Sequence, residues 1–217
     1  MTNQNQTIMK LNVLYAVAFS ATALFACGNA GTETTEATTE EVAVVESVNY
    51  TADTEASMVN WRGEVAGVYG HDGFVKLKSG SLTVAGDAIT GGEFVIDMTN
   101  IVPTDSASYK DEDGSRITDL QGHLSTEDFF ATETYPTASF TITKVEGNMV
   151  TGNLTIRDKT NEETIEIAST DMTDSGVSIT GKMVFNRQNY DVAWVHFMKD
   201  MVLSDDIALN ITLVATK

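Results

Sequence analysis

Apolar residues recur at every second position over most of the chain after about residue 48, and this period constrains the fold more than any other feature. Residues 177–185 and 207–213 show it most clearly. Shorter instances lie at 75–78, 82–84, 94–98, 140–142, 154–156 and 165–167. Because successive side chains of a β-strand point to opposite faces, such segments form strands with one apolar and one solvated face. The pattern therefore predicts an all-β domain.

Turn-forming residues separate these segments. Clusters that contain Gly, with Ala, Asp, Asn, Glu or Ser, stand at 79–80, 85–87, 91–92, 146–148 and 174–176. Residues of these types favour the tight turns that join antiparallel strands. Seven or eight strands at this spacing predict an antiparallel sandwich or barrel.

One stretch breaks the period of two. Over residues 114–124 the apolar side chains fall at helical spacing, so we expect one short helix there, capped by Asp113 or Ser115. Residues 125–128, Ser-Thr-Glu-Asp, have the form of a capping box and predict a further helical turn. We expect the next two residues, Phe129 and Phe130, to plug one end of the barrel.

Cys27, the only cysteine, follows an apolar run that is preceded by Lys10. A positive charge, an apolar core and a small residue before the cut are the parts of a secretory signal. The run is about 15 residues long, short of the roughly 20 needed to cross a bilayer as a helix. Leu-Phe-Ala-Cys at 24–27 resembles the lipobox of bacterial lipoproteins, which implies acylation of Cys27 and cleavage before it.

The segment after Cys27 is rich in Thr, Glu and Ala and lacks aromatic and basic residues as far as residue 47. It cannot bury enough apolar area to offset its chain entropy, so we expect a disordered tether. We therefore divide the chain into a signal peptide (1–26), an acylated Cys27 with its acidic tether (27–47) and one domain (48–217). The predicted location is the bacterial cell envelope, anchored by lipid. Gly28 in place of aspartate favours the outer membrane, facing the periplasm or the surface.

Charge and motifs exclude several functions. The formal net charge of −18 disfavours nucleic acid as a partner. The chain has no Gly-x-Ser-x-Gly, no Gly-rich phosphate loop and no His-Glu-x-x-His, and an acylated cysteine cannot act as a thiol nucleophile. We predict that the protein is not an enzyme and that it has no catalytic residue, no cofactor and no metal site. A metal-dependent enzyme built on His71 and His123 remains as a further hypothesis.

Residues 120–130, Leu-Gln-Gly-His-Leu-Ser-Thr-Glu-Asp-Phe-Phe, and residues 135–140, Tyr-Pro-Thr-Ala-Ser-Phe, resemble the signature of the YceI-like family of bacterial envelope proteins. Further matches lie in order around them, including Gly-Glu-Phe-Val-Ile-Asp-Met at 92–98 and Phe-Asn-Arg-Gln-Asn-Tyr at 185–190. The resemblance covers essentially the whole domain. It implies a lipocalin-like antiparallel β-barrel of about eight strands with one short helix. It also implies an interior that holds a long-chain amphiphile, such as a polyisoprenoid or a fatty-acid derivative.

A ligand tunnel of this kind would be lined by the inward-facing residues of the strands. The predicted wall consists of Phe94, Ile96, Met98, Phe140, Ile142, Leu154, Ile156, Met183, Phe185, Leu209 and Ile211. The candidates for the rim are Trp61, Trp194 and Phe197. Arg187, at the end of an alternating strand, is expected either to pair with a ligand head group or to form a structural ion pair.

Two functions remain open at this point. A packed core and an apolar tunnel use the same residues, so alternation does not separate a carrier from a solid barrel. The preferred prediction is a tethered protein that binds an amphiphile for transport or storage. The alternative is a solid-core scaffold or protein-interaction module of the envelope. The expected partners are the amphiphile and, through Cys27, the membrane, and a homodimer is also possible.

Overall fold

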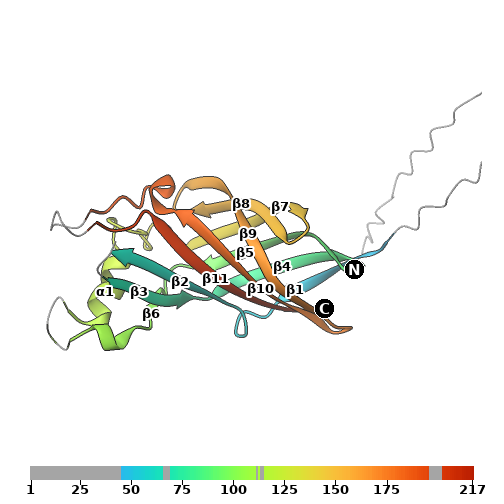
Figure 1. Ribbon diagram of the computed structural model, residues 1–217, viewed down its shortest axis with the longest axis horizontal. Helices are drawn as coiled ribbons and strands as arrows, with labels where there is room; N and C mark the ends of the chain where they lie inside the picture. Colours follow the sequence, from blue (N-terminus) through green and yellow to red (C-terminus); the bar gives the residue numbers. More distant parts are fainter. Residues whose placement is uncertain (1–44, 66–68, 111, 113–114, 196–201) are drawn as a thin grey trace, which may run out of the picture. The chain divides into compact units, whose positions relative to one another are not determined.

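The computed structural model describes residues 45–65, 69–110, 112, 115–195 and 202–217. These residues form an antiparallel β-barrel with one α-helix (Figure 1), which confirms the predicted fold class. The strands are β1 (Ser47–Ala52), β2 (Met58–Val65), β3 (Tyr69–Val75), β4 (Leu77–Ala85), β5 (Ala88–Asp97), β6 (Val102–Pro103), β7 (Thr137–Glu146), β8 (Met149–Ile156), β9 (Lys159–Met172), β10 (Gly176–Asn186) and β11 (Asp206–Thr216). The helix is α1 (Ile117–Leu124), and two 3-10 turns cover Ser106–Ser108 and Arg187–Tyr190.

Eight strands close the ring, in the order β1-β4-β5-β7-β8-β9-β10-β11, and β11 then pairs with β1. β2, β3 and β6 continue the sheet from the other part of β11. Since β11 pairs with β2 over residues 208–212 and with β1 at residues 215–216, β1 and β2 act as one interrupted strand. β3 and β4 likewise act as one strand that is interrupted at Lys76.

A buried side chain bridges the interruption between β1 and β2. Ser57 is fully buried, and its hydroxyl donates to the Val214 carbonyl at 3.1 Å and accepts the Val214 N–H at 3.0 Å. This hydroxyl therefore gives the Val214 N–H the acceptor that a backbone carbonyl would otherwise supply, while the Val214 carbonyl also accepts the Asp53 N–H at 2.8 Å. Lys76 lies between β3 and β4, and its ammonium donates to the Glu55 carbonyl in the segment between β1 and β2. This hydrogen bond links the two interruptions.

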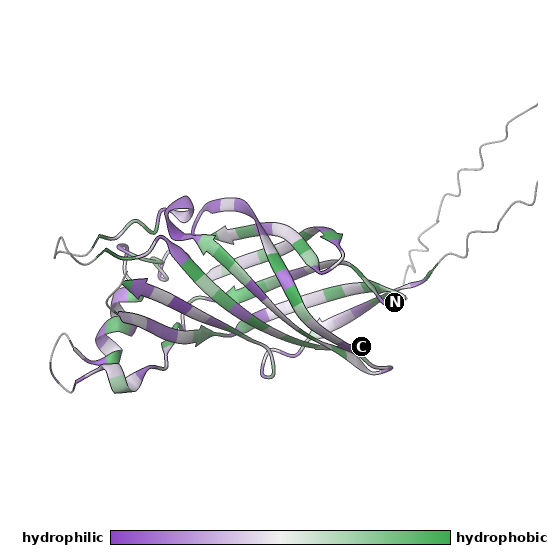
Figure 2. Cartoon of the chain, viewed as in Figure 1, coloured by the Kyte–Doolittle hydropathy of each residue, from purple (hydrophilic) through white to green (hydrophobic). Residues whose placement is uncertain are grey.

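The strands alternate as the sequence predicts. In β10, Val177, Ile179 and Met183 are buried, whereas Lys182 and Val184 are exposed. Figure 2 shows the same alternation of hydrophobic and hydrophilic residues along neighbouring strands. Because each strand buries one face only, its apolar side chains point into the barrel and its polar ones into solvent.

The helix is shorter than predicted, because it begins at Ile117 and not near residue 114. Its N-cap is Arg116, whose backbone N–H donates to the Asp119 carboxylate at 2.8 Å, so the predicted cap Ser115 was wrong. The other predicted cap, Asp113, lies outside the described residues. Within the described residues, no helix is long or apolar enough to cross a membrane.

The predicted turn after α1 is present as a single turn, in which the Phe129 N–H donates to the Thr126 carbonyl at 3.0 Å, but the Ser125 side chain does not cap it. The Ser125 hydroxyl donates to the Gln121 carbonyl at 3.1 Å, and the Thr126 hydroxyl donates to the His123 carbonyl at 2.7 Å. The Ser125 hydroxyl therefore satisfies a carbonyl in the last turn of α1, and the Thr126 hydroxyl adds to the Thr126 N–H, which also donates to the His123 carbonyl at 3.0 Å. Residues 125–130 form turns that lead to β7.

The two ends of the barrel differ. α1 lies at one end, and the chain's C-terminus and the start of β1 lie at the other (Figure 1). At the C-terminal end the buried side chains of Tyr50, Val84, Val177 and Ala215 belong to the hydrophobic core. They take no part in the cavity described below, so this end is packed solid.

Large aromatic rings lie over glycines of neighbouring strands. A Cβ atom on Gly152 would lie 2.5 Å from Cζ of Phe140, and one on Gly73 would lie 2.2 Å from Cζ2 of Trp61. Phe94 occupies the corresponding space above Gly80, at 2.6 Å. Because these glycines have no side chain, each ring rests against the barrel wall.

Substituting Gly152 by alanine should therefore destabilise the barrel. The new methyl group would meet both the Phe140 ring and the Thr141 carbonyl at 2.5 Å. Overpacking of this kind lowers the free energy of unfolding by about 1–3 kcal/mol, measurable by urea denaturation. Gly91→Ala is the matched control, since its Cβ would lie 3.9 Å from the nearest atom, and an equal loss in both variants would contradict this account.

Candidate ligand cavity

A cavity of about 660 Å³ occupies the barrel interior on the side of α1. Its wall is built from inward-facing residues of every strand of the ring except β1, with added residues from β2 and β3. A volume of this size is typical of small-molecule sites, and an apolar lining suits a hydrocarbon chain. Residues of α1 and of the preceding loop, including Tyr109 and Arg116, line its outer end.

The structure places the predicted wall residues around this cavity. Phe94, Ile96, Met98, Phe140, Ile142, Leu154, Ile156, Met183, Phe185, Leu209 and Ile211 all line it. The predicted rim residues Trp61 and Trp194 line it as well, and Phe197 lies outside the described residues. Contact of these side chains with a ligand stays a prediction.

Other lining residues were missed at the level of sequence. Leu77, Leu82, Ile165 and Ile179 line the cavity from alternating strands, so the same period could have identified them. Tyr109 lines it from a loop, where no periodicity marks a residue as inward-facing.

Three aromatic rings pack together at the α1 end. The His123 ring lies edge-on to Phe129 at 4.9 Å and to Trp194 at 5.1 Å, between ring centroids. Phe129 and Trp194 are 5.5 Å apart, and Phe130 also lines the cavity. Arg157 fixes this group from outside, because its Nη1 donates to the Phe129 carbonyl at 3.2 Å and to the Asp191 carbonyl at 2.7 Å.

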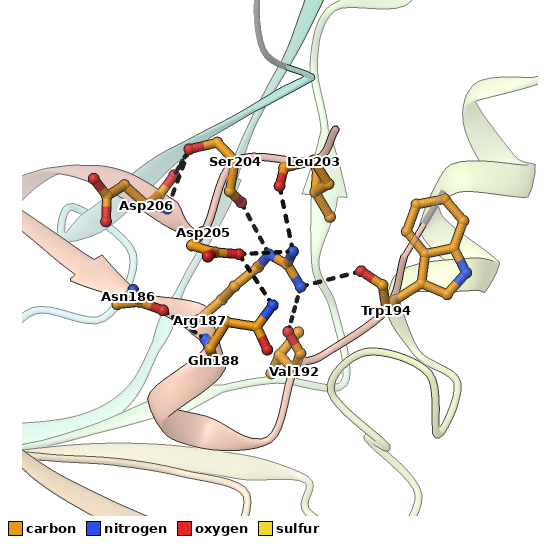
Figure 3. A network of polar contacts seen from close by, with 9 residues as sticks. All are labelled: Asn186, Arg187, Gln188, Val192, Trp194, Leu203, Ser204, Asp205 and Asp206. Atoms are coloured by element: carbon orange, nitrogen blue, oxygen red, sulfur yellow. Dashed lines mark hydrogen bonds and ion pairs between the residues drawn. The ribbon is translucent and has the colours of Figure 1, made fainter. Parts of the chain in front are cut away.

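Arg187 is buried beside the cavity and holds the connection between β10 and β11 (Figure 3). Its Nη1 donates to the carbonyls of Val192 and Trp194, and its Nε donates to the Ser204 carbonyl. Its Nη2 donates to the Leu203 carbonyl and to Asp205, with which it forms an ion pair at 3.1 Å.

All five N–H groups of the guanidinium are thereby engaged. Burial lowers the pKa of Arg187, and the charge of Asp205 opposes that shift. Of the two roles that the sequence left open, the structure supports the structural ion pair, because no N–H of Arg187 is left for a head group.

A polar group lies at the same end of the cavity. His71 Nδ1 is 2.9 Å from Oδ2 of Asp105 and 2.7 Å from the Tyr109 hydroxyl. The rings of His71 and Tyr109 stack at 5.3 Å, and Tyr69 lies edge-on to His71 at 5.2 Å. His71, Tyr69 and Tyr109 line the cavity, so hydrogen-bonding groups face an otherwise apolar space.

Two tyrosines ionise less readily than usual. Burial, followed by the charges of Asp105 and Tyr69, raises the pKa of Tyr109 well above its ordinary value. Burial also raises the pKa of Tyr190, whose hydroxyl donates to Glu163 Oε1 at 2.9 Å. Both phenols therefore remain protonated over the physiological range.

The hypothesis of a metal site on His71 and His123 gains no support. Among the residues that the structure describes, no group of three or more His, Cys, Asp or Glu side chains is arranged to hold a metal ion. His71 is bound to Asp105, and His123 packs against aromatic rings.

Comparison with known proteins identifies relatives. The model of the YceI-like domain family matches residues 50–215. A UPF0312 protein of Staphylococcus aureus (strain N315) is 36% identical over 76 residues, which is 32% of this chain and 44% of that protein. The chain therefore spans less than half the length of this curated relative.

A solved structure of another protein shares the fold. BcnA of Burkholderia cenocepacia superposes with a TM-score of 0.59 and 19% identity, covering 76% of this chain and 99% of that one. A polyisoprenoid binding domain from Saccharophagus degradans, implicated in plant cell wall breakdown, gives a TM-score of 0.49 and 13% identity over 77% of this chain and 97% of its own.

Replacing Arg187 by lysine should destabilise the protein strongly. Lysine keeps the charge but offers three N–H groups on one nitrogen, so several of the five acceptors lose their partner. We expect a loss of about 2–4 kcal/mol in the free energy of unfolding by urea denaturation. The control is Arg62→Lys, since the ion pairs of Arg62 with Glu64 and Asp72 are exposed and contribute little. Similar losses in both variants would show that Arg187 has no special structural role.

Alkaline titration should reveal late-ionising tyrosines. Because folding raises the pKa of Tyr109 and Tyr190, their protonated form contributes stability below the ordinary tyrosine pKa of about 10, and this is lost as pH rises above it. Tyrosinate absorbance should show a late component that Tyr109→Phe and Tyr190→Phe each reduce. A late component unchanged by either substitution would assign it to other residues.

Proposed function

This chain belongs to the YceI-like domain family, and from that premise we propose that it binds a long-chain amphiphile within its barrel. The tail would occupy the apolar cavity, and the polar end would lie near α1. The observation that carries the proposal is the unfilled volume of about 660 Å³, surrounded by buried apolar side chains.

The expected affinity follows from burial. Each buried CH₂ contributes about 0.8 kcal/mol, so a tail of about 16 such groups contributes roughly 13 kcal/mol. Association and ordering cost at least about 4 kcal/mol, so at most about 9 kcal/mol remains, which limits the affinity to roughly the micromolar to sub-micromolar range. Hydrocarbon burial alone can therefore hold such a ligand.

Selectivity for the tail should be low. Apolar walls discriminate poorly between ligands that differ by one or two methylene groups, because each methylene group contributes little binding free energy. Met98 and Met183 line the cavity, and flexible thioether side chains adapt to tails of different shape. A role in transport or storage within the cell envelope is compatible with such a binding mode.

Anchoring is a separate part of the proposal. Cys27 and the acidic tether lie outside the described residues, and the lipobox-like sequence is the support for acylation at Cys27. An acyl anchor would keep the barrel beside the envelope membrane from which an amphiphile is drawn. A homodimer stays a prediction.

The alternative function, a scaffold with a solid core, is less well supported. Protein interiors pack closely and leave few voids larger than a water molecule. A scaffold with a solid core is therefore not expected to contain a cavity of this volume.

Filling the cavity should abolish binding and leave the fold intact. Ala138 is buried in β7 and lines the cavity, so Ala138→Trp would project an indole into the void. We expect at least a tenfold loss of farnesol affinity by calorimetry and a change in melting temperature below about 5 °C. Mass spectrometry of organic extracts should detect an amphiphile in the wild type only.

The control is Ala208→Trp, at a position of β11 whose neighbours Ile207 and Leu209 line the cavity while it does not. It should leave farnesol binding unchanged. A wild-type protein that neither binds farnesol nor yields an amphiphile would contradict the carrier function. Unfolding of Ala138→Trp alone would instead support a solid core.

A further inference from the structure

The polar group at the α1 end of the cavity has a defined hydrogen-bonding state. Asp105, as a carboxylate, can only accept, and its Oδ2 lies 2.9 Å from Nδ1 of His71. Nδ1 therefore carries a hydrogen, and in the neutral form of the imidazole the lone pair lies on Nε2. Asp105 thus fixes both the tautomer and the orientation of the ring.

Tyr109 is left with a hydrogen to donate. Its hydroxyl lies 2.7 Å from the same Nδ1, which already carries a hydrogen, so the tyrosine oxygen accepts there. The O–H hydrogen then remains available to another acceptor. The raised pKa of Tyr109 keeps that hydrogen in place at neutral pH.

His71 and Tyr109 therefore present an acceptor and a donor side by side. In the part of the chain that the structure describes, nothing hydrogen-bonds Nε2 of His71. Both residues line the cavity, and their stacked rings, 5.3 Å apart, limit the freedom of each. A complementary pair of this kind matches a hydroxyl group, which donates once and accepts once or twice.

The surrounding charges disfavour an anionic group. Oδ1 of Asp105 is buried without a hydrogen-bond partner among the described residues, so its negative charge is poorly compensated. Arg62 is paired with Glu64 and Asp72 at 2.7 Å each. Arg187 has engaged all its N–H groups, and Arg116 shares the cavity end with Asp119. A phosphate head group would therefore meet repulsion from Asp105.

We propose that His71 and Tyr109 form a subsite for a neutral, hydroxyl-bearing head group. The ligand O–H donates to Nε2 of His71, and the Tyr109 hydroxyl donates to the ligand oxygen. Asp105 acts as a positioning residue through His71. This inference rests on the proposed function, since it specifies the polar end of the amphiphile held in the cavity.

Three ligands with one tail test the subsite by calorimetry on the purified full chain. Farnesol can donate and accept, farnesyl methyl ether can only accept, and farnesyl phosphate is anionic. We expect farnesol to bind roughly tenfold more tightly than the ether, because the ether leaves Nε2 without a partner. Farnesyl phosphate should bind more weakly than farnesol.

Variants assign the effect to the two residues. His71→Phe should reduce the difference between alcohol and ether to less than about twofold, because the phenyl ring keeps the stacking and loses the acceptor. Tyr109→Phe should weaken alcohol and ether by a similar factor, roughly fivefold, since both lose one donor. Tyr50→Phe, in the packed end of the barrel, is the matched control and should change neither affinity.

A second measurement needs no substitution. The nitrogen resonance of His71 Nε2 in the wild type should shift with farnesol and stay in place with the ether. Equal affinity for farnesol and the ether, or tightest binding of farnesyl phosphate, would overturn the subsite and leave the carrier function standing. Failure of all three ligands to bind would overturn the carrier function itself.

Discussion

The interior of the barrel depends on where its largest rings are held. Trp61, Phe94 and Phe140 face inward, yet each occupies the space above a glycine of the adjacent strand. Residues of this size would otherwise extend across the lumen and fill it, as they do in an ordinary core. The glycines therefore act together with the aromatic residues, and the pairs decide whether the interior is packed or open.

Much of the fold could be predicted from the period of two, because burial of one face dictates it directly. The same period identified the wall residues Phe140 and Met183, whose inward direction follows from their strand position. It could not show the void, since that depends on ring orientation over Gly152 and similar positions. The period of two also could not predict local capping. The Ser125 hydroxyl donates to a carbonyl of α1, whereas the sequence indicates that it caps a further helical turn.

Long-range polar contacts were the other feature that sequence could not supply. His71 lies in β3 and Asp105 follows β6, with β4 and β5 between them in the chain. The pairing of β3 with β6 brings the two residues together. Arg187 was ambiguous for the same reason, since its acceptors lie on two segments on either side of a loop. Such contacts depend on topology, which the pattern of side chains along the chain specifies only in outline.

The packed end of the barrel limits the routes by which a ligand could reach the cavity. Tyr50, Val84, Val177 and Ala215 form a floor, so the hollow part is a blind chamber and not a through-channel. Under the proposed function, a ligand would therefore enter and leave the cavity at the α1 end. In the proposed transport role, the protein would therefore present the same end of the barrel to the donor and to the recipient of the ligand.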